Sequence, residues 1–105
     1  MKAWLPLLAA LLLAGCTQLQ SDEQKARQAC QDLCSQARAA GTPLASGPCL
    51  GRLSAAGLDD WVCDVAHDPR RPVDNLAENQ CSAYREGLAK HFVEVDEDCN
   101  AFRAA

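Results

Sequence analysis

The chain has 105 residues, with fourteen Asp and Glu against ten Lys and Arg and a formal net charge of −4. This length suffices for one small domain, and the acidic balance speaks against non-specific binding to nucleic acid or anionic lipid, because both require a basic face. Aromatic residues make up only 5% of the chain, so a core of this size needs covalent cross-links.

An export signal occupies the start of the chain. Lys2 precedes an apolar run from Ala3 to Ala14, which is shorter than the about 20 residues that span a bilayer. A basic start, a short apolar stretch and small residues at its exit are typical of a secretory signal peptide. The exit, Leu-Ala-Gly-Cys at residues 13–16, resembles the lipobox of lipoprotein signal peptides.

That resemblance implies cleavage before Cys16 and a diacylglyceryl group on its sulfur, with palmitate among the acyl chains. Two acyl chains give stable anchoring, so we expect a protein held at the cell membrane or the outer membrane, outside the cytoplasm. An ordinary secretory signal with an accidental cysteine, or a buried helix of a cytosolic domain, are the alternatives. The expected organisation is a signal peptide over 1–15, a lipid-anchored tether over 16–22 and a domain over 23–105.

An even number of cysteines remains once Cys16 is set aside. In an exported chain this indicates three disulfide bonds, each stabilising the domain by about 2–4 kcal/mol. Cys30 and Cys34 lie one helical turn apart and point the same way, so we expect them to bond different downstream cysteines. The six residues are Cys30, Cys34, Cys49, Cys63, Cys81 and Cys99.

A long amphipathic helix is expected from Ser21 to Ala40. Ser21 and Gln24 have the spacing of a capping box, and Gly41 supplies the stop. Small and apolar residues at helical spacing form one face, and they are Ala26, Cys30, Leu33, Cys34 and Ala37.

The remainder reads as short strands and loops. Residues 42–51 predict a loop and residues 50–58 a short helical turn. Residues 61–66 are the best strand candidate because they are rich in β-formers. Two prolines and several turn formers make 67–75 an exposed loop.

Two further strands are expected over 80–84 and 91–95, with a turn at 86–87 between them and residues 96–100 closing the domain. A helix over 76–84 is the competing interpretation. Together these elements predict an α+β fold, in which one amphipathic helix packs on a small antiparallel sheet linked by disulfides.

The cysteine spacing favours neither a metal site nor redox chemistry. Zinc sites pair ligands two to four residues apart with a matching second pair, and Cys30 and Cys34 have no such second pair. Thioredoxin-like sites use Cys-x-x-Cys at a helix N-terminus, whereas this pair is one residue wider and lies mid-helix. We therefore expect neither a metal nor a cofactor.

Hydrolytic chemistry has weak support. Asp64 and His67 could meet at a strand end, and Glu94 to Asp98 is an acidic run, but no serine occurs in a Gly-x-Ser-x-Gly elbow. His67 and His91 read most simply as surface histidines, and the acidic run as a solvated rim without the pattern of a calcium loop.

Two runs, Trp-Val-Cys-Asp-Val-Ala-His at 61–67 and His-Phe-Val-Glu-Val-Asp at 91–96, make the chain look like small cysteine-rich lipoproteins that carry no assigned activity. We therefore expect a binding or interaction module of the cell envelope, anchored through lipid on Cys16. Its partner is an unidentified envelope protein or ligand rather than nucleic acid. The candidate contact loop has four polar residues, His67, Arg70, Arg71 and Asn75.

Two other functions stay open. One is a small envelope hydrolase or metal-dependent enzyme that uses Asp64, His67 and the Glu94–Asp98 carboxylates. The other is an inhibitor or immunity-type lipoprotein, which the size and the charge permit. A pocket bringing both histidines to those carboxylates would favour the enzyme, and scattered, outward-facing side chains would favour the module.

Overall fold

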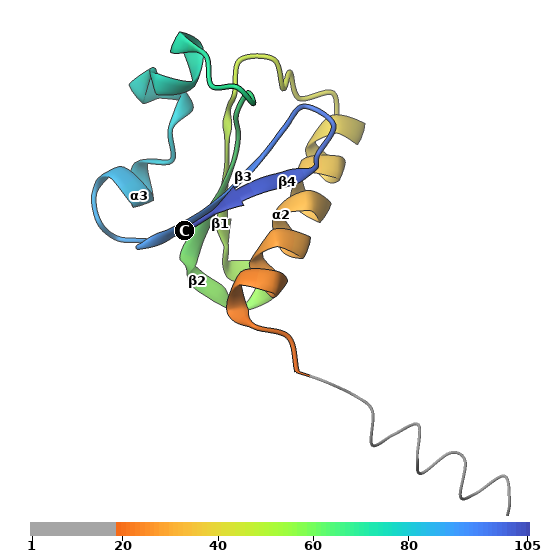
Figure 1. Cartoon of the computed structure of the whole chain (residues 1–105), viewed down its shortest axis with the longest axis vertical. Helices are drawn as coiled ribbons and strands as arrows, with labels where there is room; N and C mark the ends of the chain where they lie inside the picture. The colour runs from red at the N-terminus through yellow and green to blue at the C-terminus, as the bar shows by residue number, and fades with distance from the viewer. Residues whose placement is uncertain (1–18) are drawn as a thin grey trace, which may run out of the picture.

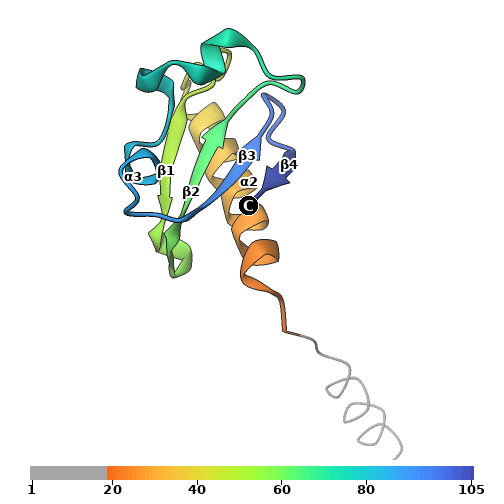
Figure 2. The ribbon, with the colours of Figure 1, turned by 60° about the vertical axis from the view of Figure 1, so that its left-hand side comes forward.

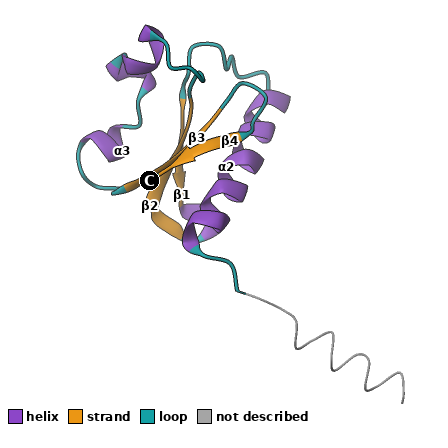
Figure 3. Cartoon of the chain, in the orientation of Figure 1, coloured by secondary structure: helices purple, strands orange, loops and turns teal. Residues whose placement is uncertain are grey.

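The computed structural model describes residues 19–105, which form one long helix packed on a four-stranded sheet (Figures 1 and 3). The expected signal peptide and Cys16 lie outside the described residues. None of the helices within residues 19–105 has the length and apolar character needed to cross a membrane. The elements are α2 (Asp22–Ala39), β1 (Cys49–Leu53), β2 (Leu58–Val65), α3 (Ser82–Arg85), β3 (His91–Val95) and β4 (Ala101–Ala104), with 3-10 turns at Ser54–Ala56, Pro72–Asn75 and Ala77–Asn79.

Helix α2 has the start that its sequence predicts. The Ser21 hydroxyl accepts a hydrogen bond from the Gln24 backbone N–H, and the Gln24 side chain accepts one from the Ser21 N–H, which completes the capping box. The residues Ala26, Cys30 and Cys34 are fully buried against the sheet. The helix and its sheet-facing side are therefore confirmed, as is the α+β class.

The sheet has the strand order β1-β2-β3-β4 and is mixed rather than wholly antiparallel. Strands β1 and β2 pair antiparallel, as do β3 and β4, but β2 and β3 run parallel with Asp64 opposite Glu94. Parallel neighbours need a crossover connection. Residues 66–90 make that crossover on the side of the sheet away from α2 (Figure 2).

The prediction of a strand over 80–84 is wrong. Residues Ser82–Arg85 form the helical turn α3 and Ala77–Asn79 a 3-10 turn, which is closer to the competing helix over 76–84. The reason is topological. Both edges of β2 are already paired, by β1 and β3, so the crossover passes over the sheet face.

Strands β1 and β4 were not predicted, because neither shows a clear alternation of buried and exposed residues. In β1, which falls where a loop and a helical turn were expected, the register shifts twice and Gly51 has a φ of +115°. Strand β4 has only four residues, and none of them is fully buried. Strand β3 lies at the predicted residues, and β2 begins three residues before the predicted start.

Each face of the sheet has its own apolar cluster. The larger cluster joins α2 to alternate residues of the strands, among them Trp61, Cys63 and Val93. The smaller cluster lies under the crossover and includes Val62, Cys81 and Ala89. The disulfide bonds are Cys30–Cys63, Cys34–Cys99 and Cys49–Cys81. Cys30 and Cys34 thus bond different downstream cysteines, as expected.

Candidate functional site

A cavity of about 590 Å³ lies between the sheet and the crossover, on the face away from α2. Cavities of this size, apolar with a few convergent polar groups, are the usual form of small-molecule sites. Its floor comes from three strands, and residues 70–85 form its walls. The lining residues are Val62, Asp64, Arg70, Gln80, Cys81, Tyr84, Arg85, Phe92, Glu94 and Arg103.

The alternation of strand side chains explains why polar groups reach this floor. Val62 pairs with Phe92 and Asp64 with Glu94 across the parallel strands, and residues two apart on a strand share a face. Two apolar residues and two carboxylates therefore lie side by side, while the residues between them face α2.

Glu94 is buried and fully partnered. Its side chain is 4% exposed, Arg70 Nη1 donates to its Oε2 at 2.8 Å, and Arg103 Nη1 lies 3.6 Å from its Oε1. Arg70 also donates to the Asn75 side chain at 2.8 Å and to the Asp74 carbonyl at 3.1 Å. The hydrogen bond with Glu94 raises the pKa of Arg70 above its ordinary value, so Arg70 keeps its positive charge.

Asp64 has no such partner. Its Oδ1 is buried without a hydrogen bond from any described residue. Burial raises the pKa of Asp64 from 3.8 to about 7, and the charge of Glu94 adds to the rise, while Arg70 opposes it. An acid that exchanges its proton near neutral pH inside a cavity is typical of functional sites.

Aromatic rings and arginines form the mouth of the cavity. Tyr84 meets Phe92 edge-on with ring centroids 5.2 Å apart, and the Arg103 guanidinium lies 5.3 Å from the Phe92 centroid. Arg103 is 58% exposed. Within the part of the chain that the structure describes, no ion pair is found for Arg85. Both guanidiniums can therefore take a further anion.

The loop over 67–75 is exposed at most positions, as expected, but two of its residues are buried, which corrects the expectation of His67 as a surface histidine. His67 is 8% and Asp74 3% exposed. His67 Nδ1 lies 2.9 Å from Asp74 Oδ1, and Nε2 lies 3.0 Å from Glu97 Oε1. We call His67, Asp74 and Glu97 the His67 cluster. Because both ring nitrogens face carboxylates, only the protonated ring donates at both.

Asp74 organises this loop. Its Oδ2 accepts from the Arg71 N–H at 2.8 Å and from the His67 N–H at 3.1 Å. Burial alone raises the pKa of Asp74, but these backbone hydrogen bonds and the His67 ring outweigh burial and lower it. The loop residues Arg70, Arg71 and Asn75 remain exposed, although Arg70 and Asn75 bond each other and Arg70 extends to Glu94.

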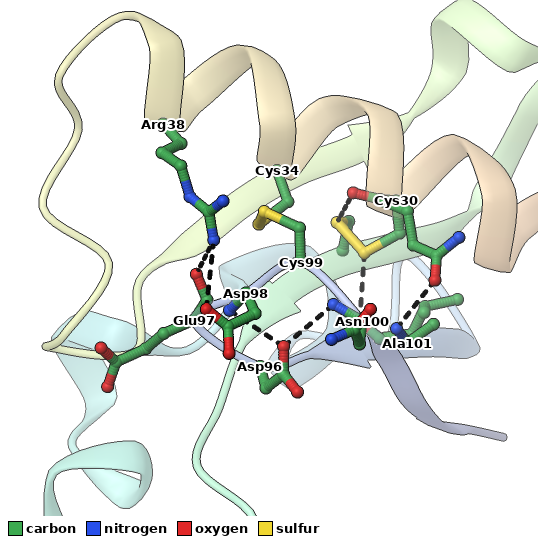
Figure 4. The surroundings of a disulfide bond; sticks show 12 residues. Cys30, Cys34, Arg38, Asp96, Glu97, Asp98, Cys99, Asn100 and Ala101 are labelled. Atoms are coloured by element: carbon green, nitrogen blue, oxygen red, sulfur yellow. Dashed lines mark hydrogen bonds and ion pairs between the residues drawn. A yellow bond between two sulfur atoms is a disulfide. The ribbon is translucent and has the colours of Figure 1, made fainter.

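The acidic run from 94 to 98 is not one rim. Glu94 belongs to the cavity and Glu97 to the His67 cluster. Asp96 accepts from the Asp98 and Asn100 N–H groups at 3.0 and 2.9 Å, which forms the turn beside the Cys34–Cys99 bond (Figure 4).

At that turn, Arg38 near the end of α2 donates to the Glu97 carbonyl and lies 3.7 Å from the Asp98 carboxylate. Within residues 19–105, no three His, Cys, Asp or Glu side chains converge as metal ligands.

The two histidines lie apart from Asp64. His91 stacks on Trp61 with centroids 4.7 Å apart and lies 3.6 Å from Asp60, and neither histidine lines the cavity. Sequence reasoning identified Asp64 and Glu94 but missed Tyr84, Arg85 and Arg103. The one available signal was a carboxylate at matching positions in two apolar runs, Val-Cys-Asp-Val and Phe-Val-Glu-Val.

Comparison with protein-family models, with curated proteins and with solved structures yields no match, so the site is interpreted from its own geometry.

Proposed function

We propose that this chain is a lipid-anchored protein of the cell envelope that acts as a binding module, and that the cavity under the crossover is its binding site. The lipobox-like residues 13–16 support the anchor. The three disulfides support an oxidising compartment, since such bonds persist outside the cytosol. Their pairing uses all six cysteines of residues 19–105, and Cys16, the seventh in the sequence, is the residue to which the lipid is assigned.

The observation that carries the binding function is Asp64. A carboxyl oxygen that is buried without a hydrogen-bond partner costs stability, and no described residue donates a hydrogen bond to Asp64 Oδ1. Proteins retain such groups where function needs them. Because Asp64 faces a cavity lined by aromatic and arginine side chains, a ligand that supplies the missing hydrogen bond accounts for its presence.

Catalysis by the expected histidines has less support. His67 does reach Glu97, but its two ring nitrogens are already taken by Glu97 and Asp74, so neither is available to a substrate. The cavity lining contains no histidine, serine or free thiol, because Cys81 is bonded to Cys49. A nucleophile with a neighbouring base is therefore not assembled there.

The placement of the cavity suits an anchored protein. The N-terminal end of α2 lies beside the β1–β2 turn, and residues 67–79 lie at the other end of the domain (Figures 1 and 2). The crossover and the cavity are on the sheet face away from α2. An anchor that enters through α2 leaves that face open to a ligand.

The anchor is tested by the intact mass of protein extracted from membranes. We expect a diacylglyceryl group on Cys16 and six cysteines that react with an alkylating reagent only after reduction. The Cys16→Ser variant serves as the control and should lose the lipid mass. Thiols that react without reduction, or a mass without lipid, would contradict the envelope assignment.

The binding site is tested by replacing Tyr84 with photo-reactive benzoylphenylalanine in cells. Irradiation should cross-link the benzoylphenylalanine at position 84 to a ligand or partner. The same replacement at Gln28, an exposed position on α2, is the matched control and should give no adduct. Equal adducts at the two positions, or none at Tyr84, would contradict the assignment of this cavity.

A further inference from the structure

The geometry points to a specific ligand class for the cavity, an inference that rests on the proposed binding function. We propose that the cavity binds a small monocarboxylate with an aromatic or apolar body. Arg85 and Arg103 hold the carboxylate, Phe92 and Tyr84 contact the body, and Asp64 bonds a polar atom of the ligand.

The charges that line the cavity favour an anion. Arg70 and Glu94 neutralise each other through a direct 2.8 Å hydrogen bond. Arg103 lies farther from Glu94, at 3.6 Å, and is more than half exposed, while Arg85 is exposed at the wall. The cavity lining thus holds three guanidiniums, of Arg70, Arg85 and Arg103, against the two carboxyls of Asp64 and Glu94. Guanidinium forks suit carboxylate oxygens in particular.

The apolar half of the ligand has a defined place. Val62 and Phe92 form the floor, and Tyr84 stands edge-on to Phe92 at its rim. Arg103 lies over the same ring, so a positive charge and an apolar surface adjoin. A ligand with a carboxylate attached to a ring matches this arrangement.

Asp64 disfavours a ligand that carries a second negative charge. Glu94 on β3 and Asp74 on the crossover add negative potential to Asp64, while Arg70 and Arg103 reduce it. From β1, its register neighbour Cys49 is disulfide-bonded and does not titrate. Protonated Asp64 can donate its missing hydrogen bond to the ligand, whereas ionised Asp64 repels it. A monocarboxylate is therefore favoured over a phosphate dianion, and binding weakens as Asp64 ionises.

Four probes that share a phenyl ring test the ligand class. Benzoate, phenyl phosphate, benzylamine and benzyl alcohol are titrated into the full-length lipidated protein in detergent micelles. NMR follows the ring signals of Tyr84 and Phe92 and the side-chain N–H signals of Arg85 and Arg103. We expect benzoate to bind most tightly. Its affinity should fall about tenfold from pH 6 to pH 8, the change expected when only the form with Asp64 protonated binds.

Variants assign the effect to individual residues. Arg103→Gln and Arg85→Gln should each weaken benzoate binding about tenfold, the order expected for a charged hydrogen bond. Arg52→Gln is the matched control, because Arg52 lines a hollow on the α2 side, and should leave the affinity unchanged. Asp64→Asn should remove the pH dependence of binding.

The outcomes separate the two proposals. If no probe shifts the Tyr84 and Phe92 signals, the cavity is not a binding site and the proposed function fails with it. If benzylamine or benzyl alcohol binds there as tightly as benzoate, the site stands and the carboxylate class is wrong. Tighter binding of phenyl phosphate would likewise replace the carboxylate by a phosphate ligand.

Discussion

At the scale of single residues, Asp64 is the side chain whose protonation sets a pH dependence of stability. Its pKa is 3.8 ordinarily and about 7 in the folded protein, so the folded state retains a proton that the unfolded state loses. The stabilising contribution is therefore complete below pH 3.8, decreases as the pH rises, and is gone above about pH 7.

The Asp64→Asn variant should remove this dependence. We expect it to be more stable than the parent above pH 7, by up to about 4 kcal/mol, with the difference shrinking toward pH 4. Urea unfolding of the disulfide-intact protein at several pH values measures this. Asp59→Asn, at an exposed carboxylate, is the control, and parallel pH profiles of parent and Asp64→Asn would refute the assignment.

Gly47 shows how closely the Asp74 loop is packed. It has a φ of +70°, and a Cβ there would lie 2.5 Å from Asp74 Oδ1 and 3.0 Å from the Val65 carbonyl. Gly57 has a similar φ of +76° with nothing within 4 Å of that position. The two glycines therefore separate backbone strain from steric conflict.

Gly57→Ala should cost about 1 kcal/mol of unfolding free energy through backbone strain alone. Gly47→Ala should lower the unfolding free energy by more than Gly57→Ala does. It should also speed amide hydrogen exchange at the His67 and Arg71 N–H groups, because Asp74 accepts hydrogen bonds from both. Denaturant unfolding and exchange measured by NMR test the pair. Equal losses in both variants would mean that the loop gives way without disturbing Asp74.

At the scale of elements, the sequence predicted what depends on local pattern. Helix α2 was recognisable from Ser21, Gln24 and the spacing of its buried face, because capping and helical periodicity are local. Strand β3 was recognisable from its β-branched residues. Two features were not recognisable from the sequence, namely the parallel pairing of β2 with β3 and the edge strand β4. Both depend on which distant segment pairs with the edge of a strand.

The candidate site was predictable only in part for the same reason. Asp64 was singled out as a possible partner of His67 and Glu94 as part of the acidic run, but their adjacency follows from the parallel register of β2 and β3. Arg103 reaches them from an unpredicted strand, and Tyr84 and Arg85 from a helical turn where a strand was expected and a helix was only the competing interpretation. His67 read as a surface residue because its burying partners, Asp74 and Glu97, are 7 and 30 residues away.

The crossover that forms the cavity wall is held by Cys49–Cys81. Replacing both cysteines by serine should lower the unfolding free energy by about 3 kcal/mol, since the bond closes a loop with a sequence separation of 32. Hydrogen exchange should increase most over residues 72–85 and least in α2. Replacing Cys34 and Cys99 is the contrasting variant and should loosen residues 96–100 instead. The same exchange pattern in both variants would argue against separate roles.

At the scale of the whole molecule, the three disulfides form overlapping covalent loops. Cys34–Cys99 encloses most of the described chain, and Cys30–Cys63 overlaps it from the N-terminal side. Every peptide bond between Cys30 and Cys99 is therefore enclosed by at least one of them. A single proteolytic cut between Cys30 and Cys99 should therefore give a molecule that gains the mass of one water and separates into fragments only after reduction.

In the proposed envelope location, where proteases can reach the chain, cleavage of the backbone and loss of the domain are therefore separate events. A single cut in the crossover, or in any other loop between Cys30 and Cys99, opens the backbone but sheds nothing. Only a cut on the N-terminal side of Cys30 can release the folded domain as one piece. Under the proposed lipid anchor on Cys16, the short segment ahead of α2 is therefore the point at which cleavage would release the domain from the membrane.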